Sequence, residues 1–206
     1  MILEIIHVGP MEANCYILAA RENSPAVIID PGAQERKIRQ HLEEYGLKPG
    51  LVVNTHGHYD HIGCDDKFGV PVYVHSADLP LLRDAELNLS GFFALAYEVK
   101  SEIKALEDGQ IIECAGVELK ALHIPGHTPG GIALLMQKPE NNIVFTGDTL
   151  FCQSIGRSDL AGGNESLLIK YIKEKLLTLP DDTIVYPGHG PSSTIGNEKK
   201  HNPFFA

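Results

Sequence analysis

Several features are scarce or missing in this chain of 206 residues. No apolar run reaches the roughly 18 residues that a membrane-spanning helix needs. The first residues, Met1 to His7, carry neither the basic region nor the small-residue cleavage site of a signal peptide. We therefore expect a protein without a membrane partner that stays in the cytoplasm.

Positive charge is also scarce. The chain has 17 Lys and Arg against 27 Asp and Glu, so its formal charge is 17 − 27 = −10 with every histidine counted neutral. An acidic chain is repelled by a phosphate backbone, and Lys199-Lys200 is its densest basic spot. The sequence therefore predicts no nucleic-acid partner, and it leaves the oligomeric state undetermined.

Cysteine is limited to four residues, and no two of them form a C-x-x-C pair. The four are Cys15, Cys64, Cys114 and Cys152. This spacing is typical neither of a disulfide framework nor of a cysteine-rich zinc site. We predict four reduced, buried thiols.

The chain lacks linkers, low-complexity segments and repeats of fixed period. Its length suits one hydrophobic core, so we predict a single domain over residues 1–206. Short apolar runs, each closed by Gly, Pro, Asn or Asp, predict strands at 2–8, 16–19, 26–29, 51–53, 72–74, 117–122, 132–136, 143–145 and 183–186.

Two segments have apolar residues at helical spacing. One contains Ile38 and Leu42 and ends at Gly46, and the other opens at Asn164 and ends before Pro180. These segments predict helices that alternate with the strands. The segment from Ser76 to Gly109 mixes helix formers with glycine and phenylalanine, and we expect a helical flap or an insertion there.

The strongest motif is H-x-H-x-D-H at residues 56–61, directly after a predicted strand. In extended backbone, His56 and His58 project to the same side and can share one ion. Asp60 and His61 then turn toward a neighbouring position. The motif therefore predicts two adjacent cation sites.

Three further candidate ligands follow later strands in glycine-rich loops: His127 in P-G-H-T-P-G, Asp148 in T-G-D-T and His189 in P-G-H-G. Five imidazoles and two carboxylates exceed what one tetrahedral zinc with an open position accepts. So many ionisable groups gather favourably only around bound cations. We assign His56, His58 and His127 to one ion and Asp60, His61 and His189 to the other, with Asp148 bridging both.

Other residues near these motifs allow two interpretations each. Asp30, at the end of strand 26–29, either orients a ligand histidine through its second ring nitrogen or forms a turn. Arg157 either pairs with Asp159 as a loop clamp or contacts the substrate. Three aromatic residues either pack within the segment from Ser76 to Gly109 or line a pocket: Phe92, Phe93 and Tyr97.

The order of the motifs resembles that of the metallo-β-lactamase superfamily: H-x-H-x-D-H at 56–61, G-H-T-P-G at 126–130, G-D-T-L at 147–150 and P-G-H-G at 187–190. The G-R-S-D segment at 156–159 is similar to that of the short bacterial glyoxalase II-like hydrolases, the hydroxyacylglutathione hydrolase family. The resemblance implies an α/β (α+β) fold, a four-layer αββα sandwich with a dinuclear site at one edge. It also implies a glutathione-contact position for Arg157, with Asp159 where that family has an aromatic residue.

The expected activity is hydrolysis by a hydroxide that bridges two divalent metal ions, because metal binding lowers the pKa of water from 15.7 to about 7. Asp60 is the predicted catalytic residue, which would orient the hydroxide and accept its proton. Zinc is the expected metal, with iron or manganese as alternatives. The motifs offer no spare acid for a departing amide, so they favour thioesters such as S-lactoylglutathione.

Two other functions remain open. A persulfide dioxygenase with one iron, at His56, His127 and Asp148, would share the G-R-[ST]-D segment. A non-catalytic metal-binding module is the other alternative. For the hydrolase, two divalent ions, two aspartates and one hydroxide sum to +4 − 2 − 1 = +1. This positive site predicts small anionic thioester or ester substrates.

Overall fold

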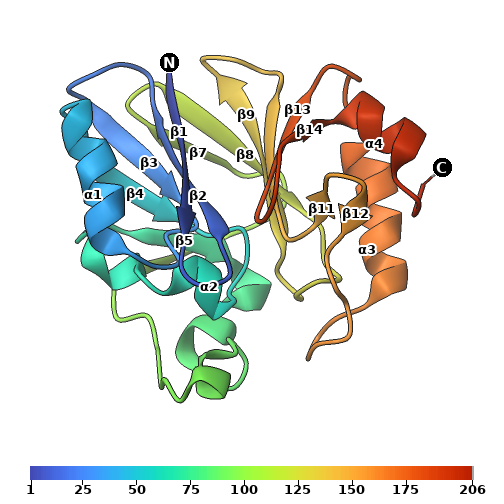
Figure 1. The fold of residues 1–206 in the computed structure, drawn as a ribbon, viewed down its shortest axis with the longest axis horizontal. Helices are drawn as coiled ribbons and strands as arrows, with labels where there is room; N and C mark the ends of the chain where they lie inside the picture. Colours follow the sequence, from blue (N-terminus) through green and yellow to red (C-terminus); the bar gives the residue numbers. More distant parts are fainter. Residues whose placement is uncertain (206) are drawn as a thin grey trace.

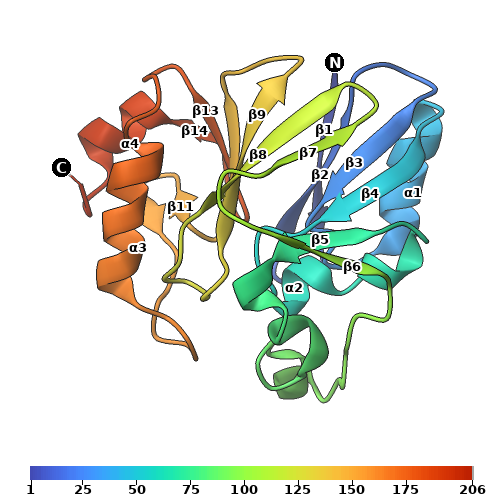
Figure 2. The same ribbon diagram turned by 180° about the vertical axis from the view of Figure 1, so that it is seen from behind.

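The computed structural model describes residues 1–205, which form two β-sheets packed face to face (Figures 1 and 2). Helix α1 (Glu35–Glu44) covers the outer face of the first sheet. Helices α3 (Glu165–Tyr171) and α4 (Ile195–His201) cover the outer face of the second. The predicted αββα sandwich is therefore confirmed.

Each sheet contains six strands. The first has the order β1 (Ile2–Val8), β2 (Ala13–Ala19), β3 (Pro25–Ile29), β4 (Lys48–Val53), β5 (Val72–His75) and β6 (Ile103–Leu106). The second has the order β14 (Ser193–Thr194), β13 (Ile184–Pro187), β10 (Ile143–Gly147), β9 (Ile132–Lys138), β8 (Val117–His123) and β7 (Ile111–Cys114). A separate short hairpin joins β11 (Leu150–Phe151) to β12 (Ser154–Ile155).

Strand β2 illustrates why the sequence contains continuous apolar runs. Its residues Cys15 and Ile17 belong to the core cluster beneath α1, whereas Tyr16 and Leu18 belong to the cluster between the two sheets. A strand buried on both faces has no polar alternation. All nine predicted strands are present, with boundaries that differ from the prediction by at most three residues.

The two predicted helices are also present. Ile38 and Leu42 of α1 are buried against the first sheet, and the side chain of Asn164 accepts a hydrogen bond from the backbone N–H of Leu167 at the start of α3. A π-helical turn (Ile172–Leu176) continues α3. Residues 76–102 form 3-10 turns (Ser76–Asp78, Leu81–Arg83, Ser90–Phe93) and loops, which lead into the edge strand β6.

The cysteine prediction needs one correction. All four thiols are free, and Cys15 and Cys64 are buried as predicted. Cys114 and Cys152 are only partly buried, because β7 is an edge strand and Cys152 lies in the tight turn of the β11–β12 hairpin. Among residues 1–205, no helix has the length and apolar character to cross a membrane.

A buried carboxylate, Asp65, lies in the 3-10 turn (Asp65–Lys67) that follows α2 (Tyr59–Ile62). Its Oδ1 accepts a hydrogen bond of 3.2 Å from Asn54 Nδ2, and its Oδ2 has no partner. Burial raises the pKa of Asp65 well above its usual value, so the native state keeps a proton that the unfolded chain releases above about pH 4.

Replacing Asp65 by asparagine should therefore stabilise the protein at neutral pH. Stability of the natural chain falls as pH rises from the unfolded to the folded pKa, by up to about 1.4 kcal/mol per pH unit, and the neutral amide removes this loss. Urea unfolding at pH 5, 6 and 7 should show a widening advantage for the variant. The exposed Asp182→Asn change is the control. A difference in the free energy of unfolding between the Asp65 variant and the natural chain that does not depend on pH would contradict the prediction.

Candidate metal centre

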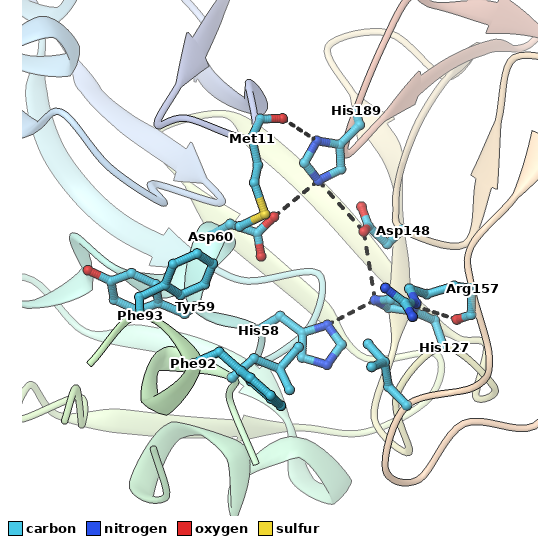
Figure 3. Close-up of a pocket in the computed structure, with 12 residues that line it drawn as sticks. Met11, His58, Tyr59, Asp60, Phe92, Phe93, His127, Asp148, Arg157 and His189 are labelled. Carbon is cyan, nitrogen blue, oxygen red and sulfur yellow. Dashed lines mark hydrogen bonds and ion pairs between the residues drawn. The ribbon is translucent and has the colours of Figure 1, made fainter. Parts of the chain in front are cut away.

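The seven predicted ligands meet at one end of the sandwich, in the segments that follow β4, β8, β10 and β13, with Asp60 and His61 in α2 (Figure 3). Their ligand atoms form three overlapping groups, each with all atoms within 4.8 Å of one another. The groups are His56, His58 and His127; His56, His61 and Asp148; and Asp60, His61 and His189. The first and third groups coincide with the two sets assigned from the sequence, and they come from both sheets.

In the first set, hydrogen bonds fix which ring nitrogen carries the proton. His127 Nδ1 donates to the carbonyl oxygen of Arg157 at 2.7 Å, so its Nε2 carries a lone pair. That Nε2 lies 2.9 Å from His58 Nδ1. His56 Nδ1 lies 3.2 Å from Thr55 Oγ1, whose own proton goes to Asp30, and the buried Nε2 of His56 has no partner.

In the second set, hydrogen bonds likewise engage one ring nitrogen of each histidine. His61 Nδ1 donates to Asp30 Oδ2 at 3.0 Å, and His189 Nδ1 donates to the carbonyl oxygen of Met11 at 3.1 Å. Their Nε2 atoms, which these hydrogen bonds leave free to bind a metal ion, face each other at 3.3 Å. Asp60 Oδ2 lies 3.5 Å from His61 Nε2 and 3.2 Å from His189 Nε2. Only a cation makes such a convergence of lone pairs and negative charge favourable.

Asp148 lies between the two sets. Its Oδ1 is 3.5 Å from His61 Nε2, its Oδ2 is 3.7 Å from both His127 Nε2 and His189 Nε2, and Oδ1 has no hydrogen-bond partner. A Cβ added at Gly188 would lie 2.1 Å from Asp148 Oδ1, so only glycine allows the backbone to approach this closely. The residues present thus fit two neighbouring cations.

The pKa values of the histidines reflect this arrangement. Burial lowers the pKa of His56 well below its usual value and that of His58 to about 3, so both imidazoles are neutral and available as ligands. Burial also acts to lower the pKa of His61, but Asp60, Asp148 and Asp30 outweigh it and raise this pKa. The second set therefore attracts positive charge, which a metal ion supplies when it replaces the proton.

Asp30 lies behind the cluster, at the end of β3. Its carboxylate accepts hydrogen bonds from Thr55 N and Thr55 Oγ1, both at 2.7 Å, and from His61 Nδ1. Its backbone has a φ of 50°, a conformation that a residue other than glycine rarely adopts. This contact with His61 is the geometry expected of a residue that orients a ligand histidine.

A second buried carboxylate, Asp78, joins two ligand loops and was not predicted from the sequence. Its Oδ2 accepts hydrogen bonds from Gly57 N at 2.9 Å and Thr128 Oγ1 at 2.8 Å, and its Oδ1 accepts one from Gly130 N at 2.6 Å. Gly57 separates His56 from His58, and Thr128 follows His127. One carboxylate thus fixes the spacing of the whole first set.

Replacing Asp78 by asparagine should loosen this set. The amide nitrogen cannot accept, so at least one buried donor loses its partner at a cost of about 1–3 kcal/mol in the free energy of unfolding. We expect metal affinity to fall about 10- to 100-fold, as for other groups that orient metal ligands. Urea unfolding and competition with a metal-binding dye would measure both effects. The exposed Asp182→Asn change is the control, and unaltered affinity would disprove the role.

The cluster forms the floor of a cavity of about 450 Å³ (Figure 3). Met11, Phe92 and Phe93 line it on one side and Arg157 lines it on the other, and Leu160 also contributes to the lining. Phe92 and Phe93 therefore line a pocket, whereas Tyr97 packs against the ring of Tyr59 at 5.5 Å between centroids. Met11 was not singled out in the sequence, because it belongs to no motif.

Arg157 forms the predicted ion pair. Its Nε and Nη2 donate to the two carboxylate oxygens of Asp159, both at 2.7 Å, and both side chains are largely exposed. An exposed pair of this kind contributes little to stability. Arg157 also lines the cavity, so the clamp and a substrate contact are compatible.

The sequence matches the family described as the metallo-beta-lactamase superfamily over residues 8–189. The chain therefore belongs to this superfamily, whose members are hydrolytic enzymes with metal sites.

Three known proteins illustrate the relationship. Hydroxyacylglutathione hydrolase GloC of Haemophilus influenzae is 36% identical over 99% of this chain and 98% of its own length, which confirms the resemblance to glyoxalase II-like hydrolases. The crystal structure of the BLEG-1 B3 metallo-beta-lactamase is 37% identical with a TM-score of 0.92, covering 100% of both chains. That of TTHA1623 in a di-iron-bound form is 36% identical with a TM-score of 0.83, covering 98% of this chain and 99% of that one.

Proposed function

We propose that this protein hydrolyses thioesters, with S-lactoylglutathione as the first substrate to test. The observation that carries the proposal is a cavity whose floor holds two adjoining sets of metal-ligand side chains, with Asp148 between them. Four members of those sets line the cavity together with Asp148: His58, Asp60, His127 and His189. No further imidazole or carboxyl group lines this cavity among the residues described.

The absence of a free acid in the cavity favours thioesters over amides. An amide nitrogen must be protonated to leave, whereas a thiol with a pKa of about 8.5 can leave as a thiolate. Tyr59 is the one remaining lining residue with an acidic proton, and its hydroxyl points away from the cluster in Figure 3. The chemistry that this lining supports is therefore acyl transfer from a good leaving group to water.

Two divalent ions bound at the cluster would lower the pKa of a shared water and attract the carbonyl oxygen of the substrate. Asp60 faces the cavity and would take the proton of the attacking water, because its carboxylate is an acceptor directed at the same space. A C–O bond forms, the C–S bond breaks, and the proton passes to the departing thiolate. The products are a carboxylate and a thiol, and the second proton of the water is released to solvent.

Relatives support the substrate class and leave two choices for the metal. GloC, named a hydroxyacylglutathione hydrolase, is similar over nearly its whole length. We propose zinc as the resident metal, because its usual ligands are those of this cluster. Iron is the alternative, since a similar protein has been crystallised in a di-iron-bound form. We further propose a small substrate with an anionic thiol portion, which Arg157 at the cavity wall would attract.

The test is a panel of three reactions with the purified, metal-loaded protein: hydrolysis of S-lactoylglutathione, hydrolysis of a β-lactam, and oxygen consumption with glutathione persulfide. We expect turnover of the thioester and two metal ions per chain. One iron per chain with oxygen consumption would instead establish a dioxygenase. A melting temperature raised by metal without any turnover would establish a binding module.

A further inference from the structure

A second, smaller cavity of about 210 Å³ lies beside the metal cavity. It extends toward Ala33, which follows β3, and toward Leu95 in the segment before β6. Four residues line both cavities: Met11, Tyr59, Asp60 and Phe93. The two spaces therefore adjoin at the edge of the second ligand set, and a ligand whose reactive atoms lie over the cluster can extend into this side cavity.

The side cavity is apolar apart from one carboxylate. Glycine, proline, alanine, methionine, leucine and aromatic side chains make up its lining, and Asp60 is the charged residue among them. No cationic side chain of the described part of the chain lines it. Asp60 without a neighbouring cation disfavours an anionic group, and the apolar remainder of the lining accepts a hydrocarbon.

Three large apolar side chains that line the side cavity are exposed to solvent. Met11 is 43% exposed, Phe93 is 48% exposed and Leu95 is 44% exposed. Apolar surface gathered beside a polar reaction centre is typical of a binding site, because covering it with a ligand removes it from water. These exposed side chains thus favour a ligand that has apolar surface of its own.

Hydrogen bonds hold the segment that carries Phe93 and Leu95 against the ligand loop. The carbonyl oxygen of Asn88 accepts from Tyr59 N at 2.8 Å, one residue before Asp60. Within the segment, Asn88 Nδ2 donates to Tyr97 O at 2.9 Å, and Tyr97 N donates to Ser90 Oγ at 3.2 Å. The apolar side chains are therefore presented by a fixed loop, which reduces the entropy lost when a ligand binds.

We propose that the side cavity binds the acyl chain of the substrate, and that the preferred thioesters carry hydrocarbon acyl groups of several carbons. This inference rests on the proposed thioester hydrolysis. A thioester has a thiol portion and an acyl portion. One side of the metal cavity carries a cation and the other is apolar, so each side suits one of the two portions. Arg157, the cation of the cavity wall, lies on the side away from Met11 and suits an anionic thiol portion (Figure 3). The apolar side beyond Asp60 is left for the acyl chain.

The test is a series of glutathione thioesters with unbranched acyl groups from acetyl to octanoyl, hydrolysed by the metal-loaded wild-type protein. Burial of one methylene corresponds to about a 3- to 4-fold gain, so kcat/KM should rise at least about tenfold from acetyl to hexanoyl. As a readout independent of turnover, calorimetric titration should show hexanoate binding at least about tenfold more tightly than acetate.

Two variants locate the effect. Leu95→Asp places a second carboxylate in the side cavity and should reduce the hexanoyl-to-acetyl ratio of kcat/KM at least about tenfold. Leu87→Asp changes another exposed leucine of the same segment, 36% exposed against 44% for Leu95, which lines neither cavity, and it should keep the wild-type ratio.

The outcomes separate this inference from the proposed function. Equal hydrolysis of all chain lengths, with no effect of Leu95→Asp on the ratio, would overturn the acyl-chain site and leave thioester hydrolysis standing. A ratio lowered equally by Leu87→Asp would also overturn it, because the effect would not be local. Failure to hydrolyse any thioester would remove the proposed function and this inference with it.

Discussion

Replacing Asp148 by alanine should abolish hydrolysis and remove at least one metal ion per chain. Asp148 is the carboxylate with oxygens near histidines of both sets, at 3.5 Å from His61 Nε2 and 3.7 Å from His127 Nε2. Loss of the metal removes several kcal/mol of transition-state stabilisation, so we expect kcat/KM to fall by about 10³-fold or more. Elemental analysis and a thioester assay measure the two effects.

The fold of the Asp148→Ala variant should survive. The Oδ1 atom has no hydrogen-bond partner, and the side chain lines the metal cavity. Circular dichroism should therefore match the wild-type spectrum. Asp159→Ala, which removes an exposed carboxylate eleven residues away, is the matched control and should keep its metal. Retained turnover with unchanged metal content in the Asp148 variant would end the dinuclear hypothesis.

Chelation of the metal should lower the melting temperature of the wild-type protein substantially. A ligand at 1,000 times its Kd stabilises the native state by about 4 kcal/mol. For a chain of this size, each kcal/mol moves the melting temperature by about 2–4 °C, so removal of metal should lower it by about 8–16 °C. Differential scanning calorimetry with and without chelator measures this change.

The Asp148→Ala variant is also the control for chelation, because its melting temperature should respond less than that of the wild type. Adding back zinc, iron or manganese one at a time shows which metal restores both stability and hydrolysis. If the chelator left activity and melting temperature unchanged, the cluster would not be a metal site.

The fold was predictable where burial is strongest. Strands such as β2 and β10 are buried on both faces, and this burial is what produces their uninterrupted apolar runs. The edge strands β6 and β7 were missed, since each buries only part of its length and carries a lysine or glutamate. Helix α2 has four residues, too few for any periodicity to appear.

The site was predictable for the residues that lie in motifs. His56, His58, Asp60 and His61 are close in sequence, and their spacing alone indicated two groups. Asp78 carries no comparable signal, because its partners Gly57 and Gly130 lie 21 and 52 residues away. Only the folded chain brings this carboxylate between them. Two lining residues were missed for the same reason, since Met11 and Leu95 lie in loops of ordinary composition.

The division of the ligands between the two sheets has a consequence for how the protein acquires its metal during synthesis. The segment 56–61 emerges from the ribosome early and supplies one part of each set. The first set is incomplete until His127 has been made, and the second until His189 has been made. A nascent chain can therefore hold an ion only loosely, and tight loading must wait until the later sheet has docked onto the earlier one.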